Sequence, residues 1–503
     1  MSKRKASFQI PVIEDQLLTL GAPTIAVIGA GPKAAAIAAK AGVLRALGLS
    51  KVNVCVIESR RPAANWDGKN GFTNGEMPLG TNPEKDCGFP YDCRIFNDDK
   101  TNASVNEWML AFSWQAYNVA QGTYSEWVDR GRLAPTHKQF ASYLRWVIDR
   151  SGARRINGTV HRIVPSKQSV SAKLFIEPHS EINGLNKAHQ ELSCRDPRLQ
   201  DISGIVAYPV DGVVLTGPGA PIPIRGTDRF KTPDVLTGED YWQHEREFLD
   251  LRDCTIGVFG GGETAATILL SLIKLTGSSC QIELVSASGL IYTRGEGFHE
   301  NQIYSRPEKW KDIEELRRPQ VIQHTDRGVF SVHAREQLDQ CERLNVIKGY
   351  VDSIKQWDNQ IGAEIRWNTK SGQDSTLRKY DRVIVARGFD AWHLPNTLLP
   401  DYFGEHTNRK DLVQQIDEHL RMPVADSKVN LHVPALAGLT QGPGFMNLSC
   451  LGTLADRILS LYVNGTNSID CNMTATVADA IGETGSGEQS GQPEPPITSV
   501  LKS

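Results

Sequence analysis

A glycine-rich turn between an apolar strand and a helix is the feature that most constrains the fold of this 503-residue chain. The apolar run over residues 24–28 predicts a buried strand, and the alanine-rich segment 32–47 predicts a helix. Between them, Gly29 permits a tight turn, Gly31 lets a pyrophosphate approach the backbone, and the small Ala34 lets helix and strand pack closely. The phosphate charge would lie at the helix N-terminus, where free N–H groups favour it. The pattern predicts a dinucleotide-binding unit.

The next strand adds a carboxylate to this unit. Residues 52–57 form a second apolar run, and Glu58 closes it. A carboxylate at this place can accept hydrogen bonds from both hydroxyls of a ribose. We therefore expect Gly29, Gly31, Ala34 and Glu58 to bind FAD. The competing interpretation is a glycine turn that only joins a strand to a helix.

The same arrangement recurs about two hundred residues later. Residues 254–259 predict a strand, 263–275 a helix and 281–285 a further strand. The turn before the helix reads GGGETA and again matches GxGxxA. The candidate cofactor-binding residues of this second unit are Gly260, Gly262 and Thr264.

The end of the last of these strands points to the phosphorylated nicotinamide cofactor. Ser286 stands where the first unit has Glu58, and Arg294 follows eight residues later. An acid there would repel a 2′-phosphate, whereas a serine with a nearby arginine could accept one. The pair therefore favours NADPH over NADH, and the competing interpretation of Arg294 is a solvated surface arginine.

Composition excludes several classes of protein. The formal net charge of -3 gives no support to binding of nucleic acid or of a membrane surface. No apolar run approaches the roughly 20 residues that a membrane span needs. The nine cysteines have no repeated spacing, which favours reduced thiols in a cytoplasmic protein, with a redox-active Cys87–Cys93 pair as the alternative. Neither HExxH nor another metal-binding spacing occurs, so we expect no metal site.

Four segments, in a shared order along the chain, resemble a known family. Residues 135–146 (PTHKQFASYLRW) are similar to the family helix P-[ST]-R-x-E-F-x-x-Y-L-x-W, and residues 298–304 (FHENQIY) to its F-x-N-E-x-F segment. Asn65-Trp66 matches a tryptophan near the flavin, and residues 441–445 (QGPGF) match a flavin-capping segment. The family is that of the flavin-dependent N-hydroxylating monooxygenases that act on lysine, ornithine or related amines. The resemblance adds Trp66, Gly442 and Gly444 to the expected cofactor-binding residues.

Carried over residue by residue, the resemblance implies a substrate site with two departures. Lys85 matches the lysine that holds a substrate carboxylate, and Asn301 matches the catalytic-site asparagine that touches substrate and nicotinamide. Asp326, however, stands where the family has a neutral substrate-binding asparagine, and Gly80 where it has a glutamine. We expect Lys85, Asn301 and Asp326 to bind the substrate, and these departures leave the identity of the amine open.

The resemblance implies an activity. NADPH reduces FAD, and O₂ is captured as a C4a-hydroperoxyflavin in a dry pocket. The neutral primary amine of an amino acid or diamine is then N-hydroxylated, for siderophore or specialised-metabolite biosynthesis. It also implies a homo-oligomer, a dimer or a tetramer.

We expect an α/β fold with two Rossmann-like dinucleotide-binding domains, for FAD and NADPH, and a small helical substrate region. Strands running into small-residue turns at 213–218 and 383–388 predict the crossings between the domains. The predicted parts are 1–250 and 381–468 for the FAD domain, 251–380 for the NADPH domain with a substrate insertion at about 296–345, and 469–503 for a disordered tail.

Three other functions stay open at this point. The first is a flavin monooxygenase that oxidises sulfur or a ketone, whose FxGxxxHxxxW/Y fingerprint is absent near residues 230–300. The second is a pyridine-nucleotide-dependent flavin reductase, which would normally carry a CxxC or CxxxxC pair. The third is a non-enzymatic dinucleotide sensor.

Overall fold

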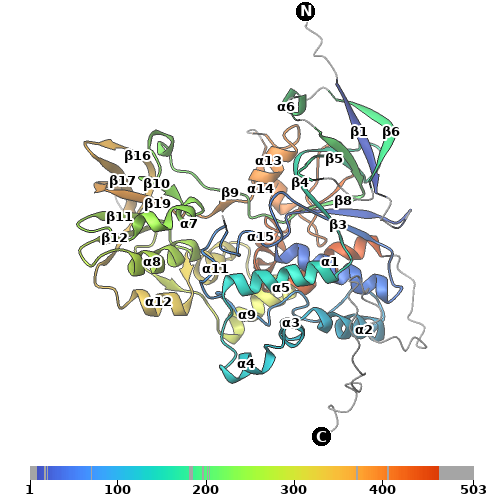
Figure 1. Cartoon of the computed structure of the whole chain (residues 1–503), viewed down its shortest axis with the longest axis horizontal. Helices are drawn as coiled ribbons and strands as arrows, with labels where there is room; N and C mark the ends of the chain where they lie inside the picture. The colour runs from blue at the N-terminus through green and yellow to red at the C-terminus, as the bar shows by residue number, and fades with distance from the viewer. Residues whose placement is uncertain are drawn as a thin grey trace, which may run out of the picture.

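The computed structural model describes residues 8–15, 19, 21–69, 71–180, 185–194, 197–200, 202, 204–369, 372–404 and 407–463. They form two lobes, each built around its own sheet, with a group of short helices beside both (Figure 1). Across these residues, no helix is long and apolar enough to cross a membrane. The tail predicted over 469–503 lies outside the described residues.

The first lobe contains a nine-stranded sheet whose central strands are parallel. Its strands, in spatial order, are β21 (Asn430–His432), β8 (Gly212–Leu215), β2 (Thr24–Ile28), β3 (Asn53–Glu58), β4 (Arg154–Pro165), β5 (Ala172–Pro178), β7 (Val206–Val210), β1 (Phe8–Asp15) and β6 (Leu185–Cys194). The strands predicted at 24–28 and 52–57 are confirmed as β2 and β3.

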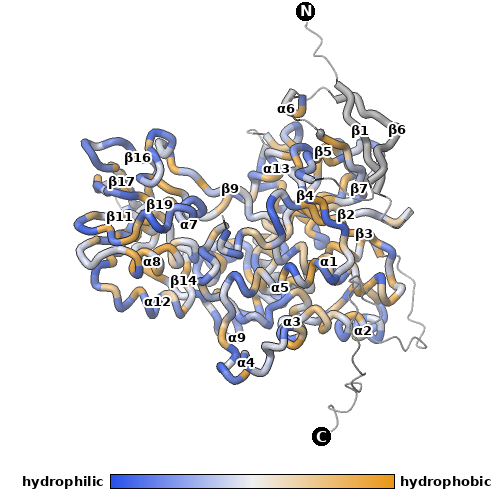
Figure 2. The backbone as a smooth tube through the Cα atoms, viewed as in Figure 1, coloured by the Kyte–Doolittle hydropathy of each residue, from blue (hydrophilic) through white to orange (hydrophobic). Residues whose placement is uncertain are grey.

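Helix α1 (Pro32–Ala46) connects β2 to β3 and lies in the interior of the first lobe. Its alanines are buried on all sides because α1 packs against α5 (His137–Arg150) and α16 (Leu451–Leu459) as well as against the sheet. Small side chains allow this close packing. Figure 2 shows the central strands of this lobe as hydrophobic.

The start of α5 has a local cause. Thr136 Oγ1 accepts a hydrogen bond from the backbone N–H of Gln139, and the Gln139 side chain accepts one from the backbone N–H of Thr136. This capping box satisfies two N–H groups that a helix start otherwise leaves free. The predicted helix over 135–146 is thus confirmed, and it continues to Arg150.

The second lobe contains a five-stranded parallel sheet and a three-stranded antiparallel sheet. The parallel strands, in spatial order, are β10 (Val235–Thr237), β19 (Arg382–Val385), β11 (Thr255–Phe259), β12 (Gln281–Ser286) and β15 (Leu344–Lys348). The antiparallel strands are β16 (Tyr350–Trp357), β17 (Gln360–Thr369) and β18 (Gly372–Tyr380). Helix α8 (Glu263–Leu275) joins β11 to β12, which confirms the second predicted strand–helix–strand unit.

Two short strands lie where the chain crosses between the lobes. β9 (Ala220–Pro221) follows the first-lobe strand β8, and β20 (Phe389–Asp390) follows the second-lobe strand β19. They pair antiparallel with each other, at the segments predicted to be crossings. Strands β10 and β19 both belong to the five-stranded sheet of the second lobe. The predicted domain boundaries at residues 250 and 380 stay predictions.

Short helices lie in three stretches of the chain between strands, before β15, before β4 and before β21. Between β12 and β15 the chain forms α9 (Phe298–Ser305), α10 (Pro307–Trp310), α11 (Arg318–Thr325) and α12 (Val332–Leu338). Before β4 it forms α2 (Asp99–Met109), α3 (Trp114–Ala120) and α4 (Tyr124–Asp129), and α13 (His393–Leu398) and α14 (Arg409–Gln414) precede β21.

A buried ion pair fastens α16 to α1. Lys40 Nζ lies 2.5 Å from Asp456 Oδ1, and the two side chains are 1% and 7% exposed. Lys40 also donates to the backbone carbonyl of Gly452, at 3.1 Å. Burial raises the pKa of Asp456, and the charge of Lys40 opposes that rise. The first and last helices of the lobe are therefore joined by charge as well as by apolar contact.

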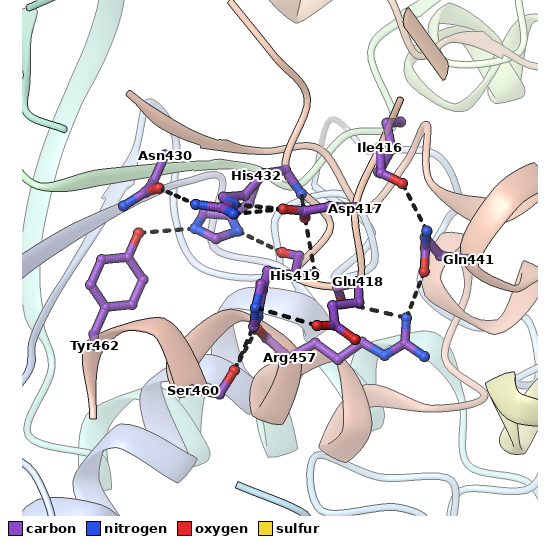
Figure 3. Close-up of polar contacts among 11 residues, drawn as sticks. Ile416, Asp417, Glu418, His419, Asn430, His432, Gln441, Arg457, Ser460 and Tyr462 are labelled. Carbon is purple, nitrogen blue, oxygen red and sulfur yellow. Dashed lines mark hydrogen bonds and ion pairs between the residues drawn. The ribbon is translucent and has the colours of Figure 1, made fainter. Parts of the chain in front are cut away.

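A second polar cluster holds the end of α16 against β21 (Figure 3). His432 is fully buried; its Nδ1 lies 2.8 Å from the carbonyl oxygen of His419, and its Nε2 lies 2.9 Å from Tyr462 Oη. The carbonyl can only accept, so Nδ1 carries the proton and the tyrosine donates to Nε2. Burial lowers the pKa of His432 to about 4. The histidine is thus neutral in the folded protein.

The ion pair predicts a large effect of removing one partner. Asp456→Asn leaves Lys40 buried without a counter-charge, so we expect the free energy of unfolding to fall by about 3–5 kcal/mol. The double variant K40M/D456L restores most of that stability, because an apolar pair replaces the ion pair. Urea denaturation of the purified protein measures both changes. The exposed pair Arg130–Glu126 is the control, and a loss at Asp456 no larger than at that pair contradicts the prediction.

His432 predicts a pH-dependent contribution to stability. The unfolded chain binds a proton at this residue near pH 6.5, whereas the folded protein does so only near pH 4. Stability is therefore lost as the pH falls from about 6.5 to 4, by up to about 3 kcal/mol. The difference in unfolding free energy between the native protein and His432→Gln, measured by urea denaturation at several pH values, isolates this contribution. A difference that does not change with pH would contradict it.

Candidate active site

A cavity of about 1330 Å³ is lined by residues of both lobes. Both glycine turns contribute to its wall, as do the ends of β3, β8, β12 and β19. The predicted site residues that line it are Gly29, Gly31, Glu58, Trp66, Gly260, Gly262, Thr264, Ser286, Arg294 and Asp326. The topology therefore brings ten separately predicted residues to one cavity.

The first glycine turn is shaped for close approach. Gly29 has φ +96°, and a Cβ at this position would lie 2.4 Å from Thr216 Oγ1. Nothing lies within 4 Å of the place where a Cβ of Gly31 would stand, so the backbone there is open to a ligand. Glu58 Oε2 accepts a hydrogen bond from the backbone N–H of Ala30, at 2.9 Å. Ala34 is buried in α1 and does not line the cavity.

The second turn is equally tight. Gly260 has φ +147°, and a Cβ there would lie 2.1 Å from the carbonyl oxygen of Ala386. Gly262 is the N-cap of α8, and Thr264 lies in the first turn of the helix. The start of α8 has no side-chain cap, and Gly262, Glu263 and Thr264 there line the cavity. This is an arrangement that can hold a phosphate.

Two polar groups beside the second turn have no hydrogen-bond partner among the residues that the structure describes. The Oγ of Ser286 and the Nε of Arg294 are both buried and make no hydrogen bond. Arg294 uses its Nη1 to donate to the carbonyl oxygen of Gly80 in the first lobe, at 3.2 Å. Buried polar groups are nearly always satisfied, so these two point to a ligand that supplies hydrogen-bond partners. The residues present therefore fit a second, anionic dinucleotide.

Trp66 forms part of an aromatic wall on the other side of the cavity. Its ring lies 5.4 Å from that of His137 and 5.5 Å from that of Phe140. Burial lowers the pKa of His137 to about 4, and its Nδ1 has no hydrogen-bond partner within the described part of the chain. His137 was not among the predicted site residues, although it lies within the 135–146 segment at the place of the family's arginine.

Lys85 and Asn301 are brought together from distant parts of the chain. Lys85 Nζ lies 2.5 Å from Asn301 Oδ1, and Asn301 Nδ2 donates to the carbonyl oxygen of Glu296 at 2.7 Å. Burial lowers the pKa of Lys85, with Glu296 opposing and Arg294 adding to that effect. Neither residue is among those that line the cavity, but the charge of Lys85 interacts with that of Arg294, which does line it.

Asp326 places a negative charge in the cavity wall. Its side chain is 7% exposed; Oδ1 accepts a hydrogen bond from Asn447 Nδ2 at 3.0 Å, and Oδ2 lies 3.5 Å from Arg327 Nε. Arg327, which directly follows Asp326, and Asn447 also line the cavity, and no motif in the sequence marked Asn447. Tyr304, one turn beyond Asn301 on α9, contacts Thr325 with its hydroxyl at 2.6 Å. The Tyr304–Thr325 contact thus joins α9, which carries Asn301, to α11, which directly precedes Asp326.

Gly442 and Gly444 lie behind the cavity wall rather than in it. A Cβ on Gly444 would stand 1.9 Å from the carbonyl oxygen of Tyr304, and one on Gly442 would stand 3.4 Å from Pro307. Both glycines let the 441–445 segment pack closely against α9 and α10. The following residues, 446–449, line the cavity. The expected contact of the two glycines with a flavin stays a prediction.

Comparison with known proteins agrees with this site. Residues 103–391 match the family model described as L-lysine 6-monooxygenase/L-ornithine 5-monooxygenase. The chain is 37% identical over 443 residues to the L-lysine N6-monooxygenase MbtG of Mycobacterium sp. (strain MCS), covering 87% of this chain and 94% of that protein. It is 35% identical over 450 residues to MbtG of Mycobacterium tuberculosis (strain ATCC 25618 / H37Rv), with coverage of 87% and 94%.

Solved structures show the same architecture. The lysine monooxygenase NbtG from Nocardia farcinica superposes with a TM-score of 0.69 at 31% identity, covering 87% of this chain and 99% of that one. The ornithine hydroxylase PvdA from Pseudomonas aeruginosa superposes with a TM-score of 0.63 at 18% identity, with coverage of 88% and 99%, and shows the fold alone.

These matches decide between the functions that the sequence left open. The family match and the identity to lysine N6-monooxygenases support N-hydroxylation of an amine rather than sulfur or ketone oxidation, flavin reduction or sensing. The two glycine turns and the unpartnered donors beside them fit the two dinucleotides that this chemistry needs. The chain belongs to the L-lysine 6-monooxygenase/L-ornithine 5-monooxygenase family and is a flavin-dependent N-hydroxylating monooxygenase that uses FAD, NADPH and O₂.

Proposed function

We propose that the enzyme hydroxylates the side-chain amine of L-lysine and that Lys85, Asn301 and Asp326 bind this substrate. The observation that carries the proposal is a pair of opposite charges. The positive charge is that of Lys85, which contacts Asn301, and the negative charge is that of Asp326 in the cavity wall. A free α-amino acid offers a carboxylate to the lysine and an α-ammonium to the aspartate. The curated relatives, which are L-lysine N6-monooxygenases, support the same substrate.

In this proposal, Asp326 favours an amino acid over a simple amine. A neutral asparagine could accept a hydrogen bond from an α-ammonium, but a carboxylate also attracts its charge. Asn447 holds one oxygen of Asp326, which leaves the second oxygen beside Arg327 as the group that can turn to the substrate. In this proposal, Asp326 in place of the family's asparagine therefore favours L-lysine as the substrate over an amine without an α-ammonium group.

The proposed cofactor contacts follow from the same cavity. Gly29, Gly31 and the start of α1 would hold the pyrophosphate of FAD, and Glu58 its ribose. Gly260, Gly262 and Thr264 would hold the pyrophosphate of NADPH. Ser286 and Arg294 would take its 2′-phosphate, which satisfies their unpartnered atoms.

When bound and reduced, FAD would supply the chemistry that activates O₂, one atom of which the amine receives while the other leaves as water. The chain's own residues bind and orient the amine and keep water out. Leu79, Phe72 and Leu144 provide apolar wall beside Trp66. A dry wall disfavours a charged amine, and only the neutral amine has the electron pair that the reaction requires.

We further propose that the enzyme works in the cytoplasm as a homodimer or homotetramer. Among the described cysteines, seven are free thiols, Cys87 and Cys93 included. Phe298 and Leu316 are large apolar side chains that are 70% and 84% exposed. Sedimentation of the purified protein tests the oligomeric state, and a monomer at micromolar concentration contradicts it.

The substrate is tested by turnover. The purified yellow protein is supplied with NADPH and, in turn, with L-lysine, L-ornithine and cadaverine, and hydroxylamine and hydrogen peroxide are both measured. We expect hydroxylamine in proportion to NADPH oxidised with L-lysine, and mostly peroxide with cadaverine, because cadaverine lacks the two charged groups at one end. Equal hydroxylamine yields from lysine and cadaverine would remove the proposed roles of Lys85 and Asp326.

The anchor predicts a specific kinetic defect. Lys85→Met removes a charged hydrogen-bond donor, so we expect the KM for L-lysine to rise about 10–100-fold with a smaller change in kcat and unchanged flavin content. Steady-state NADPH oxidation measures both constants. Lys100→Met, at an exposed position on α2, is the matched control. An unchanged KM in Lys85→Met would exclude Lys85 from the substrate site.

Arg294 predicts cofactor discrimination. If its guanidinium binds the 2′-phosphate, Arg294→Ala raises the KM for NADPH about 10–100-fold and leaves the KM for NADH within about twofold. The measurement is flavin reduction under anaerobic conditions with each cofactor. Equal losses with both cofactors would show that Arg294 acts through its contact with Gly80 rather than through the phosphate.

A further inference from the structure

We propose that Asp86 is a positioning residue that sets Lys85 for recognition of the substrate carboxylate. The proposal rests on the proposed role of Lys85 and goes beyond it, because Asp86 has no contact with the cavity. Its carboxylate instead shapes the turn at residues 86–91, which begins directly after Lys85.

The carboxylate of Asp86 collects three hydrogen bonds from two separate segments. Oδ1 accepts from the backbone N–H of Gly88 at 3.0 Å and from the hydroxyl of Tyr91 at 2.8 Å. Oδ2 accepts from the backbone N–H of Trp114, the first residue of α3, at 2.9 Å. Asp86 is 2% exposed, so water does not replace these bonds. One buried carboxylate thus joins the turn to the start of a helix.

Lys85 lies between two fixed points of backbone. On one side, its N–H donates to the carbonyl oxygen of Asn82 at 3.0 Å. On the other side, the N–H of Cys87 donates to Tyr143 Oη at 3.1 Å, and that hydroxyl donates to the carbonyl oxygen of Phe112 at 2.8 Å. With its backbone held on both sides, Lys85 directs its ammonium to Asn301.

The far side of the turn has no room to move. The carbonyl oxygen of Phe89 accepts a hydrogen bond from the backbone N–H of Gly452 at 2.7 Å, in the first turn of α16. A Cβ on Gly452 would stand 2.2 Å from the carbonyl oxygen of Gly88. Because α16 blocks movement of residues 86–91 in one direction, we expect a turn that has lost its internal hydrogen bonds to displace the backbone of Lys85, which directly precedes it.

The ionised form of Asp86 is the one that fits its partners. All three partners donate, and a carboxylate can accept from all of them, whereas a protonated acid or an amide presents a donor to at least one. Burial raises the pKa of Asp86 to about 6, and the bonds from Trp114 and Tyr91 oppose the rise. The other titratable groups facing it are Cys87 and Tyr143, whose pKa values are raised by burial. At neutral pH the carboxylate therefore holds the turn.

The test compares two substrates that differ only at the carboxylate. For FAD-loaded enzyme with NADPH, kcat/KM is measured from the linear range with L-lysine and with L-lysinamide. We expect Asp86→Asn to lower kcat/KM for lysine about tenfold and to change that for lysinamide less than about twofold, because lysinamide makes no ion pair with Lys85. Asp92→Asn is the matched control, since Asp92 lies in the same loop but is exposed and bonded to Arg94. It should leave both values unchanged.

A general loss of structure gives a different result. If Asp86→Asn lowers kcat/KM equally for lysine and lysinamide, or leaves the ratio unchanged, the proposal is overturned. Tyr91→Phe removes one of the three bonds and keeps the charge, and we expect it to lower the lysine-to-lysinamide ratio about threefold. If Asp86→Asn does not fold, the ratio in Tyr91→Phe alone decides.

Lys85→Met separates this proposal from the one on which it rests. If Lys85→Met leaves the lysine-to-lysinamide ratio unchanged, Lys85 does not bind the carboxylate and the proposed substrate site fails. If Lys85→Met lowers the ratio while Asp86→Asn and Tyr91→Phe do not, the substrate site stands and only the positioning role of Asp86 is overturned.

Discussion

The buried ion pair between Lys40 and Asp456 joins the first helix of the chain's first dinucleotide unit to its last helix. Because α1 and α16 are held together, the glycine turn at the start of α1 and the cavity-lining segment 446–449 before α16 face the same space. The first turn of α16 also binds the turn at residues 86–91, which directly follows Lys85, because the backbone N–H of Gly452 donates to the carbonyl oxygen of Phe89. The Lys40–Asp456 ion pair thus helps to fix the position of the first glycine turn relative to Lys85, the proposed substrate anchor.

The elements of the two dinucleotide units could be predicted because their signals are local. The strand at β2, the helix α8 and the strand β12 follow from apolar runs and from glycines that only a tight turn requires. The pairing of β9 with β20 could be anticipated as a crossing but not as a pair of strands, because two residues of strand carry no periodicity. Membership of β10 in the second sheet depends on a parallel partner about 150 residues away, which no local pattern reveals.

The site was predictable where motifs mark it and hidden where tertiary contacts build it. Lys85 and Asn301 are separated by 216 positions, yet each stands in a recognisable segment, and they meet at 2.5 Å. Asn447 meets Asp326 in the cavity wall from 121 positions away, and nothing in its own sequence context distinguishes it. His137 replaces an arginine in a quoted motif, so its signal was present but its chemistry, a neutral imidazole with an unpartnered nitrogen, required the buried setting.

The orientation of Asn301 shows how little freedom the proposed anchor has. Its Nδ2 donates to the carbonyl oxygen of Glu296, which leaves Oδ1 as the only amide atom that can meet Lys85. An aspartate at this position would place a carboxylate against that carbonyl and pair too strongly with the lysine, since a full charge would compete with the substrate carboxylate. An asparagine holds the ammonium in place without adding a negative charge of its own. The lysine is therefore oriented by a neutral partner and remains available to an anion.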